Sequence, residues 1–188
     1  MAKNNAPTFV VTGKCRLSYA HIWEPSRMSD DDPLKYSACI IIPKTDKTTL
    51  DKIRAAVEAA TKDGIASKWK GKKPANLKLP LRDGDDERPD DPAFAGCYFF
   101  NANSRNQPQV VDMARNEILD QDEIYSGCYC RFSINFYPFN GRQNGVAAGL
   151  GNVQKVCDGE RLAGGTRAED DFDDDFEDTG SGALDDIL

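Results

Sequence analysis

The sequence predicts a mainly β domain with one inserted helix (α+β), in which five to six strands form a partly open β-barrel that is followed by a disordered acidic tail. Three observations lead to this prediction. Several short segments alternate between apolar and polar residues, which is typical of half-buried strands. Only residues 48–62 show the apolar spacing of a helix. The last residues, 169–188, are too acidic and too poor in apolar side chains to fold.

The overall charge divides the chain into two parts. The tail, residues 169–188, carries ten carboxylates and no cation, so removing its charge from the formal −7 leaves residues 1–168 at +3. A body of this length suffices for one well-cored domain. No apolar run is long enough to cross a bilayer, and the first residues contain no hydrophobic signal. We therefore expect a cytoplasmic protein with no membrane partner.

Cysteine and histidine usage limits the chemistry. The closest cysteines are Cys128 and Cys130, and no C-x-x-C pair occurs among the six. Together with the distant His21, two thiols do not supply the four ligands of a zinc site. We expect reduced, mostly buried thiols, with no metal and no cofactor. A single histidine also leaves little material for histidine-based catalysis.

The first strand is expected in residues 9–19. One face of this segment is apolar and ends at Tyr19, whereas the other carries the basic side chains of Lys14 and Arg16. Such a basic open face suits a polyanion. Trp23 begins the turn-rich loop that follows, and we include it with Lys14 and Arg16 among the candidate nucleic-acid-binding residues.

Four further elements follow in order. Residues 35–42 are almost continuously apolar and predict a central strand. The helix over 48–62 has a single apolar stripe and a stop signal at Gly64. Residues 96–102 predict another strand, with aromatic side chains on both faces, and residues 109–112 a short one.

The segment 67–82 combines many cations with one aromatic ring. An unpaired nucleic-acid strand needs both, because cations neutralise phosphates and a flat ring stacks on an exposed base. We therefore interpret this segment as a candidate binding surface. The alternative for the aromatic residue is that its ring fills the core below the helix end, and the sequence favours neither. The candidates are Lys68, Trp69, Lys70, Lys72, Lys73, Lys78 and Arg82.

Residues 83–91 reverse the charge and raise an alternative function. Clustered carboxylates can hold a divalent metal, which would make the protein a metal-dependent nuclease or resolvase. The spacing does not match a calcium-binding loop, because Gly84 comes second and no bidentate glutamate closes the run. An exposed acidic loop is the simpler interpretation. The carboxylates of the alternative are Asp83, Asp85, Asp86 and Glu87.

The densest pattern lies in residues 127–140. Its core face consists of Cys128, Cys130, Phe132, Ile134 and Phe136. The opposite face carries two aromatic rings, one guanidinium and small polar residues, which is the pattern of a platform on which bases stack. The strand should return as a glycine-rich hairpin partner over residues 145–156. The candidates on the open face are Tyr129, Arg131 and Tyr137.

Several longer motifs stand out in the body: KYSACIIIPK, PLRDGD, GCYFFNANS, YSGCYCRFSINFYPFN and GLGNVQKVCDGERLAGG. Together they resemble a family of tailed-phage single-stranded-DNA-binding proteins that was formerly catalogued as a phage domain of unknown function. The resemblance covers residues 10 to about 166. It implies an oligonucleotide-binding (OB) fold and the coating of single-stranded DNA during phage replication, recombination or repair in the infected bacterial cell.

The tail resembles the acidic tails of bacterial and phage single-strand binders. Its most similar motif is DFDDDF, although this motif ends twelve residues before the C-terminus, and the chain closes with LDDIL. We expect the tail to compete with DNA for the basic body and to recruit phage or host replication partners; a tail that only solvates the protein is the alternative. A homodimer is compatible with the sequence. The tail candidates are Asp171, Phe172, Asp173, Asp174, Asp175 and Phe176.

Two functions from different classes therefore remain. The leading hypothesis is a non-catalytic protein that binds single-stranded DNA without sequence preference, since no side chains suited to reading base edges stand out. The alternative is the nuclease built on residues 83–91. Magnesium-dependent cleavage of a labelled oligonucleotide separates the two, because a binding protein shifts the oligonucleotide and leaves it intact.

Overall fold

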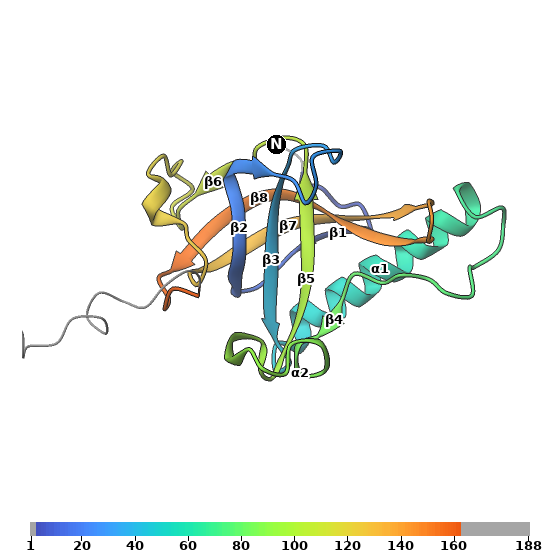
Figure 1. The fold of residues 1–188 in the computed structure, drawn as a ribbon, viewed down its shortest axis with the longest axis horizontal. Helices are drawn as coiled ribbons and strands as arrows, with labels where there is room; N and C mark the ends of the chain where they lie inside the picture. The colour runs from blue at the N-terminus through green and yellow to red at the C-terminus, as the bar shows by residue number, and fades with distance from the viewer. Residues whose placement is uncertain (1–2, 163–188) are drawn as a thin grey trace, which may run out of the picture.

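The computed structural model describes residues 3–162, whose strands join into one mixed sheet with a single long helix beside it (Figure 1). The prediction of a mainly β, partly closed barrel with one inserted helix is confirmed. The expected tail, with the candidates Asp171 to Phe176, and the domain boundary after residue 168 lie outside the described residues. None of the helices in residues 3–162 is long and apolar enough to cross a membrane.

Five long strands close the barrel. Strand β2 pairs antiparallel with β3 and β7, β3 pairs antiparallel with β5, and β7 with β8, whereas β5 and β8 run parallel. The ring is thin at two seams, because β2 meets β7, and β5 meets β8, through only two residue pairs each. This pairing is that of the partly open OB barrel that the resemblance implies. The strands are β2 (Cys15–Ser26), β3 (Lys35–Pro43), β5 (Cys97–Ser104), β7 (Tyr129–Phe139) and β8 (Gly145–Cys157).

Short elements cover the edges of the barrel. Strand β1 pairs with β7, β4 with β5, and β6 with β8. A short helix and two 3-10 turns complete the loops. The bounds are β1 (Phe9–Val11), β4 (Arg82–Asp83), α2 (Gly84–Glu87), η1 (Pro92–Phe94), β6 (Val110–Val111) and η2 (Gln121–Glu123).

The single strand predicted over residues 9–19 is wrong in two places. The chain turns at Thr12, whose buried hydroxyl accepts a hydrogen bond from the Phe132 N–H (3.0 Å) and so ends β1. Further on, the pairing of β2 with β3 shifts register, and Tyr19 adopts a positive φ of 44°. This irregularity turns Tyr19 out of the predicted apolar face, so that its side chain is 54% exposed.

The core follows the alternation that the sequence predicts for β7. The five residues expected on its inner face, from Cys128 to Phe136, are all at most 1% exposed. They pack against apolar side chains of β2, β3, β5 and β8. Cys15 joins them, and its burial raises the pKa of the thiol to about 12, which keeps it protonated. All six cysteines are free.

The helix α1 (Lys47–Ser67) is longer than predicted. Asp46 caps its first turn through a hydrogen bond that its carboxylate accepts from the Thr49 N–H (3.2 Å). Gly64, the predicted stop, lies inside the helix, where the absence of a side chain leaves room for the ring of Trp69. An added Cβ at Gly64 would lie 2.6 Å from that ring.

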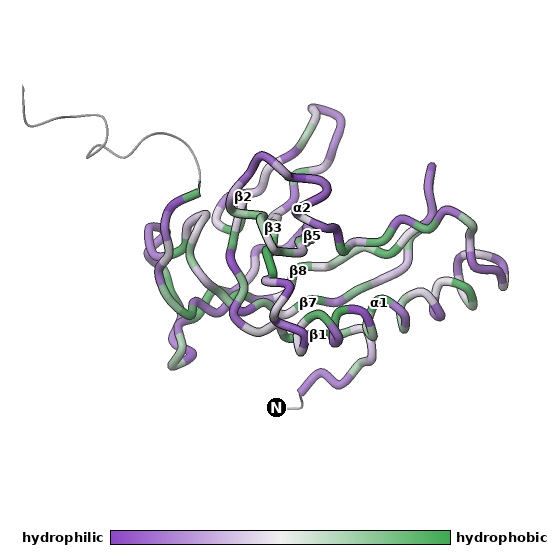
Figure 2. Tube along the Cα trace, turned by 90° about the horizontal axis from the view of Figure 1, so that it is seen from below, coloured by the Kyte–Doolittle hydropathy of each residue, from purple (hydrophilic) through white to green (hydrophobic). Residues whose placement is uncertain are grey.

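The end of α1, the loop after it and the tip of the β7–β8 hairpin extend together from the barrel (Figure 1). We call this extension, residues 62–79 and 138–146, the arm. Its far end is hydrophilic along the loop after α1 (Figure 2). At its base Lys78 joins the hairpin, since its N–H donates to the Asn144 carbonyl and its carbonyl accepts from the Val146 N–H, both at 2.9 Å.

Trp69 holds the two halves of the arm together. Its indole N–H donates to the carbonyl of Phe139 in the hairpin (3.2 Å), and its ring packs on Gly64 of α1. The side chain is only 6% exposed. A large aromatic ring with a satisfied N–H at such a junction contributes both buried apolar area and orientation.

We predict that Trp69→Ala lowers the free energy of unfolding by about 3 kcal/mol, because it removes a buried aromatic ring and leaves a cavity between α1 and the hairpin. Urea denaturation followed by circular dichroism measures the change. Lys70→Ala, an exposed substitution on the same loop, should stay within about 0.5 kcal/mol of the wild type. Equal unfolding midpoints for Trp69→Ala and the wild type would show that the ring does not stabilise the arm.

Candidate nucleic-acid interface

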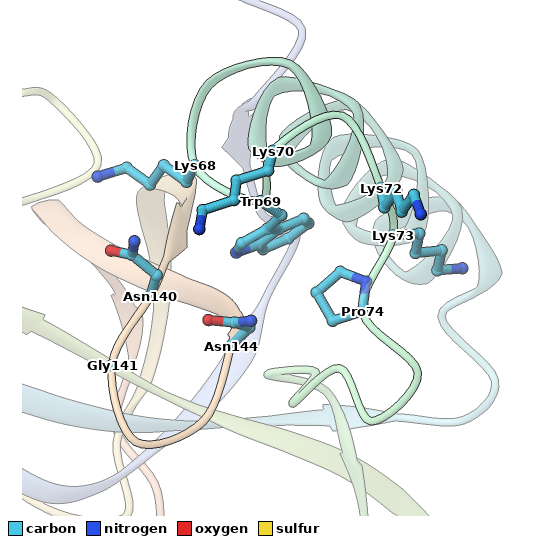
Figure 3. A pocket seen from close by; sticks show the side chains of 9 residues that line it. All are labelled: Lys68, Trp69, Lys70, Lys72, Lys73, Pro74, Asn140, Gly141 and Asn144. Atoms are coloured by element: carbon cyan, nitrogen blue, oxygen red, sulfur yellow. The ribbon is translucent and has the colours of Figure 1, made fainter.

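The arm tip gathers most of the predicted lysines into one basic surface. The side chains of Lys68, Lys70, Lys72 and Lys73 are exposed, and none forms an ion pair with a carboxylate of residues 3–162. They surround an open pocket of about 520 Å³ between the loop after α1 and the hairpin turn (Figure 3). The pocket is lined by Lys68, Trp69, Lys70, Lys72, Lys73, Pro74, Asn140, Gly141 and Asn144.

The backbone after α1 determines how these lysines point. Lys70 and Gly71 both have positive φ angles, 55° and 78°, so the chain reverses sharply at the helix end. Figure 3 shows Lys70 extending over Trp69 toward the hairpin, whereas Lys72 and Lys73 project away from it. The tip therefore presents positive charge in several directions, which suits a flexible polyanion.

Trp69 itself is not part of that surface. Its ring lies beneath the lysines and is buried against Gly64, with its N–H bonded to Phe139. Of the two interpretations left open by the sequence, packing in the core describes this residue. Its binding role is corrected to an indirect one, because a ring without an exposed face cannot stack on a base.

A second open surface lies on the outer side of β3 and β5. The register places Ser37 beside Asn103 and Cys39 beside Asn101, with the two asparagine side chains exposed. In an OB barrel the second and third strands, here β3 and β5, form the usual oligonucleotide-binding face, flanked by the loop between the fourth and fifth strands. That loop is the hairpin tip, residues 140–144, which also lines the basic pocket of the arm, so we treat the strand face and the arm as two parts of one candidate site.

The lower half of this face is apolar and is covered by arginines. Phe94 and Phe99 pack edge to face, with ring centroids 5.0 Å apart. The guanidinium of Arg88 lies 5.7 Å from the first ring centroid and 5.8 Å from the second. Arg88 pairs with no carboxylate of residues 3–162. The rings therefore hold an exposed, unneutralised cation at the edge of the open face.

Arg82, predicted as a free cation, has a partner. Its guanidinium forms an ion pair with Glu87 and lies 5.1 Å from the centroid of Phe99. Lys78, by contrast, is exposed and forms no ion pair within residues 3–162, although its backbone is fixed in the arm. Of these two candidates, only Lys78 has a positive charge that no carboxylate of residues 3–162 neutralises.

Three candidates predicted on two separate strands, Lys14, Arg16 and Tyr129, lie together in the structure. Lys14 and Arg16 both lie over the Tyr129 ring, with the ammonium 5.5 Å and the guanidinium carbon 5.7 Å from the centroid. The half-buried Arg16 donates to the carbonyls of Gly127 (3.2 Å) and Glu160 (2.8 Å). Its donors are thus occupied in tying the C-terminal segment to β2, so its assignment to DNA is corrected, whereas Lys14 remains exposed.

Arg131 and Tyr137 share the outer face of β7 but differ in whether their side chains are free to contact a ligand. Arg131 donates to the Thr12 carbonyl (3.2 Å) and to the Gln154 side chain (3.1 Å), so its guanidinium is committed within the protein. Tyr137 is 42% exposed and lies beside Gly149 of β8, which has no side chain to cover that part of the ring. Tyr137 is consequently the predicted aromatic residue that best offers a stacking face.

Trp23 lies in β2. Its indole N–H donates to the Ile124 carbonyl (3.4 Å), and its half-buried ring packs on the core. Part of the ring is therefore engaged in packing, and the stacking role of Trp23 stays a prediction.

Two of the carboxylates that the nuclease alternative requires form ion pairs with a lysine. The ammonium of Lys44 lies 2.8 Å from a carboxylate oxygen of both Asp83 and Asp85. Its hydrogen bonds lower the pKa of both carboxyl groups. Asp85 also accepts a hydrogen bond from the Gly96 N–H (2.9 Å), so the pair fixes the local backbone. Within residues 3–162, no three His, Cys, Asp or Glu side chains are arranged to hold a metal ion.

The predicted residues thus fall into two groups: those whose polar groups are exposed and those whose polar groups already contact other parts of the protein. The cations at the arm tip come together with the hairpin turn, and the exposed Tyr137 lies apart from them beside Gly149. The polar groups of five other candidates are engaged within the protein: Trp23, Trp69, Arg16, Arg82 and Arg131. Sequence reasoning missed Asn101, Asn103 and Arg88. The alternation of Asn101 and Asn103 with apolar residues marks one strand face and could have identified them, but Arg88 sits in an acidic run that hides its role.

Comparisons with known sequences agree on one family. Residues 8–182 match the family described as Enterobacter phage Enc34, ssDNA-binding protein. A relative, the putative protein p50 of Acyrthosiphon pisum secondary endosymbiont phage 1, is 31% identical over 170 residues, which cover 85% of this chain and 89% of that protein.

Solved structures of phage single-stranded DNA-binding proteins are similar to this chain. The single-stranded DNA-binding protein from bacteriophage Enc34, in complex with ssDNA, has a TM-score of 0.75 at 26% identity and covers 86% of this chain and 97% of its own. A C-terminal truncation of the Enc34 protein has a TM-score of 0.71 at 26% identity, over 86% and 95% of the two chains. The single-stranded DNA-binding protein gp2.5 of bacteriophage T7 shares the fold, with a TM-score of 0.60 at 19% identity over 92% and 96%.

The family match spans nearly all of the sequence, and the described barrel superposes on the Enc34 protein over most of both chains. The chain therefore belongs to the Enc34 family of phage single-stranded-DNA-binding proteins.

Proposed function

We propose that this protein binds single-stranded DNA without sequence preference, along the open face of β3 and β5 and onto the arm. The observation that carries the proposal is the set of exposed lysines at the arm tip, which form no ion pair within residues 3–162 and lie beside the hairpin turn that flanks the usual binding face of OB barrels. The Enc34 protein, whose structure is a complex with ssDNA, shares this barrel over 86% of the chain.

The side chains of the candidate site would contact different parts of the DNA. The arm lysines and Arg88 neutralise phosphates, since they have no carboxylate partner within residues 3–162. Tyr137 supplies a ring for stacking, and the amides of Asn101 and Asn103 bond to whichever base or sugar edge passes them. Contacts of these kinds tolerate any sequence.

The role is non-catalytic in this proposal. Lys44 neutralises Asp83 and Asp85, and a metal ion would have to displace its ammonium before it could bind there. The comparisons also point to binding proteins. We therefore do not favour the nuclease alternative. The setting is the cytoplasm of an infected bacterium, where the protein coats single strands during replication, recombination or repair.

The acidic tail acts in this proposal as a competitor of DNA. Its ten carboxylates, in residues 169–188, are attached to a body of charge +3 and therefore compete with phosphates for the same cations. The motif from Asp171 to Phe176 also gives the tail a means of recruiting replication partners, with phenylalanines between the acids.

Salt should weaken binding steeply. If the arm lysines and Arg88 neutralise about four to five phosphates, a plot of log K against log salt should have a slope near −3, at roughly −0.7 per phosphate. Fluorescence anisotropy of a labelled oligonucleotide at increasing NaCl measures this slope. Oligonucleotides of different sequence should give similar values, and a slope close to zero would remove the arm from the binding site.

Replacing the exposed ring should weaken binding without unfolding the barrel. Tyr137→Ala is expected to cost about 1–3 kcal/mol of single-strand affinity, because it removes one stacking face. Tyr137→Phe keeps the ring and should bind nearly as the wild type does. The same titration measures both variants, and unchanged affinity for Tyr137→Ala would exclude stacking at this position.

Removing the tail should strengthen binding. A chain that ends at Ala168 is expected to bind single-stranded DNA more tightly than the full chain, most clearly at low salt, where charge competition is least screened. Its body, at +3, should also begin to bind duplex DNA nonspecifically. Identical affinities of the two proteins at every salt concentration would contradict the competitor role.

A further inference from the structure

The tip of the β7–β8 hairpin contains two asparagine–glycine pairs, Asn140–Gly141 and Asn144–Gly145. Both asparagines line the basic pocket of the arm. Asparagine followed by glycine is prone to spontaneous deamidation, because glycine has no side chain to keep its backbone nitrogen away from the preceding amide. The two pairs differ in how freely that nitrogen can move.

Deamidation is an intramolecular substitution that needs only water. The backbone nitrogen of glycine loses its proton to hydroxide and attacks the side-chain carbonyl carbon of asparagine. The new bond closes a succinimide ring, and the bond to the side-chain nitrogen breaks, so that ammonia leaves with a proton taken from water. Water then opens the ring at either carbonyl and gives aspartate or isoaspartate. The net change replaces a neutral amide by a carboxylate.

The Asn140–Gly141 pair lies in an open part of the turn. Both residues are exposed, and neither belongs to a strand. The Gly141 N–H donates no backbone hydrogen bond among residues 3–162. Apart from the neighbours of Gly141 in the chain, a Cβ placed on it would meet no atom nearer than the Gln143 carbonyl oxygen, at 4.0 Å. The Gly141 nitrogen can therefore turn toward the Asn140 amide, and hydroxide can reach it.

The Asn144–Gly145 pair is held in place. The Asn144 carbonyl accepts a hydrogen bond from the Lys78 N–H (2.9 Å), and Gly145 is buried in β8, in register with Phe139. A Cβ on Gly145 would lie only 2.5 Å from the Lys78 carbonyl oxygen. Attack would require the chain to rotate out of this arrangement, and a nucleophile kept from its target loses orders of magnitude in rate. This pair is therefore an internal control.

The lysines of the pocket favour the reaction at Asn140. Figure 3 shows the side chains of Lys68 and Lys70 extending over the turn that carries Asn140, and all three residues line the pocket. Negative charge develops on the glycine nitrogen and then on the oxygen of the attacked amide, and nearby cations lower the barrier to such a step. Neither lysine forms an ion pair with a carboxylate of residues 3–162, so both charges act on the amide.

We propose that Asn140 is a site of spontaneous deamidation at the arm tip, promoted by the lysines around it. The product places a carboxylate inside the pocket, where it pairs with a lysine and removes that cation from the DNA site. Older protein thus carries a weaker arm than newly made protein. The reaction itself follows from the structure of the turn, and only its effect on DNA binding rests on the proposed function.

Trypsin separates the two pairs and so makes the reaction measurable. Because it cleaves after arginine and lysine, peptides 132–142 and 143–155 carry one pair each. After incubation of the full chain at mildly alkaline pH, mass spectrometry with fragmentation should show that Asn140 converts at least about tenfold faster than Asn144, relative to a sample that was not incubated. In urea, which unfolds the protein, the two rates should become similar. Equal rates in the folded protein overturn the proposal.

Two variants test the two parts of the argument. Gly141→Ala adds a methyl group where the structure leaves open space, and it should slow the conversion of Asn140 at least about tenfold, because the side chain hinders the approach of the nitrogen. Lys68→Ala/Lys70→Ala keeps the pair and removes the nearby charges, which should slow the conversion about threefold or more. An unchanged rate in the lysine variant would refute promotion by the pocket.

Asn140→Asp reproduces the product for DNA titrations. It should weaken single-strand binding at least about threefold at low salt and make the slope of log K against log salt shallower by about 0.7, the share of one phosphate. Asn116→Asp changes the net charge equally at an exposed position after β6 and should bind as the wild type does. If Asn140→Asp binds with wild-type affinity, the effect on DNA is refuted, whereas the mass measurements decide separately whether Asn140 deamidates.

Discussion

The junction between Trp69, Gly64 and Phe139 determines where the positive charge of this protein lies. The buried ring locks the loop after α1 onto the hairpin, with its N–H bonded to the Phe139 carbonyl. Without that junction the lysines would follow a free loop, and their charges would be spread over many positions. With it they form a compact basic tip beside the turn of the β7–β8 hairpin. In the proposed function this buried aromatic residue acts indirectly, by positioning the cations that lie above it.

Several arginines of this protein hold the fold together, whereas the four lysines at the arm tip form no ion pair within residues 3–162. Arg16 and Arg131 donate to carbonyls and an amide, and Arg82 pairs with Glu87, in keeping with the several fixed donors of a guanidinium. Lysines at the arm tip lack such partners within the described residues. Their flexible, fully hydrated charges follow a mobile phosphate chain better than they fix a geometry. Arg88 differs from these three arginines, because aromatic rings support its guanidinium and no carboxylate of residues 3–162 pairs with it.

Much of the fold was predictable from alternation, and much of the site was not. The inner face of β7 and the central strand over residues 35–42 follow from local pattern, because burial on one side of a strand repeats every second residue. Tyr19 could not be placed, since a register shift and a positive φ have no reliable signal in a single sequence. Nothing in the local sequence around Trp69 or Arg16 indicates whether the side chain is free in solvent or bonded to another part of the protein. Their partners, Phe139 and Glu160, are distant in the chain, so only the tertiary structure decides.

The proposed function makes the acidic tail and DNA competitors for the same lysines, and the two differ in what else they can contact. A single strand of DNA that binds the arm can continue along β3 and β5, where the exposed side chains of Asn101, Asn103 and Arg88 offer further contacts. An acidic segment gains nothing from the two amides that it does not already have in water, so on this proposal the strand face favours DNA. Short oligonucleotides that cover only the arm lack this advantage, and the tail should exclude them most effectively.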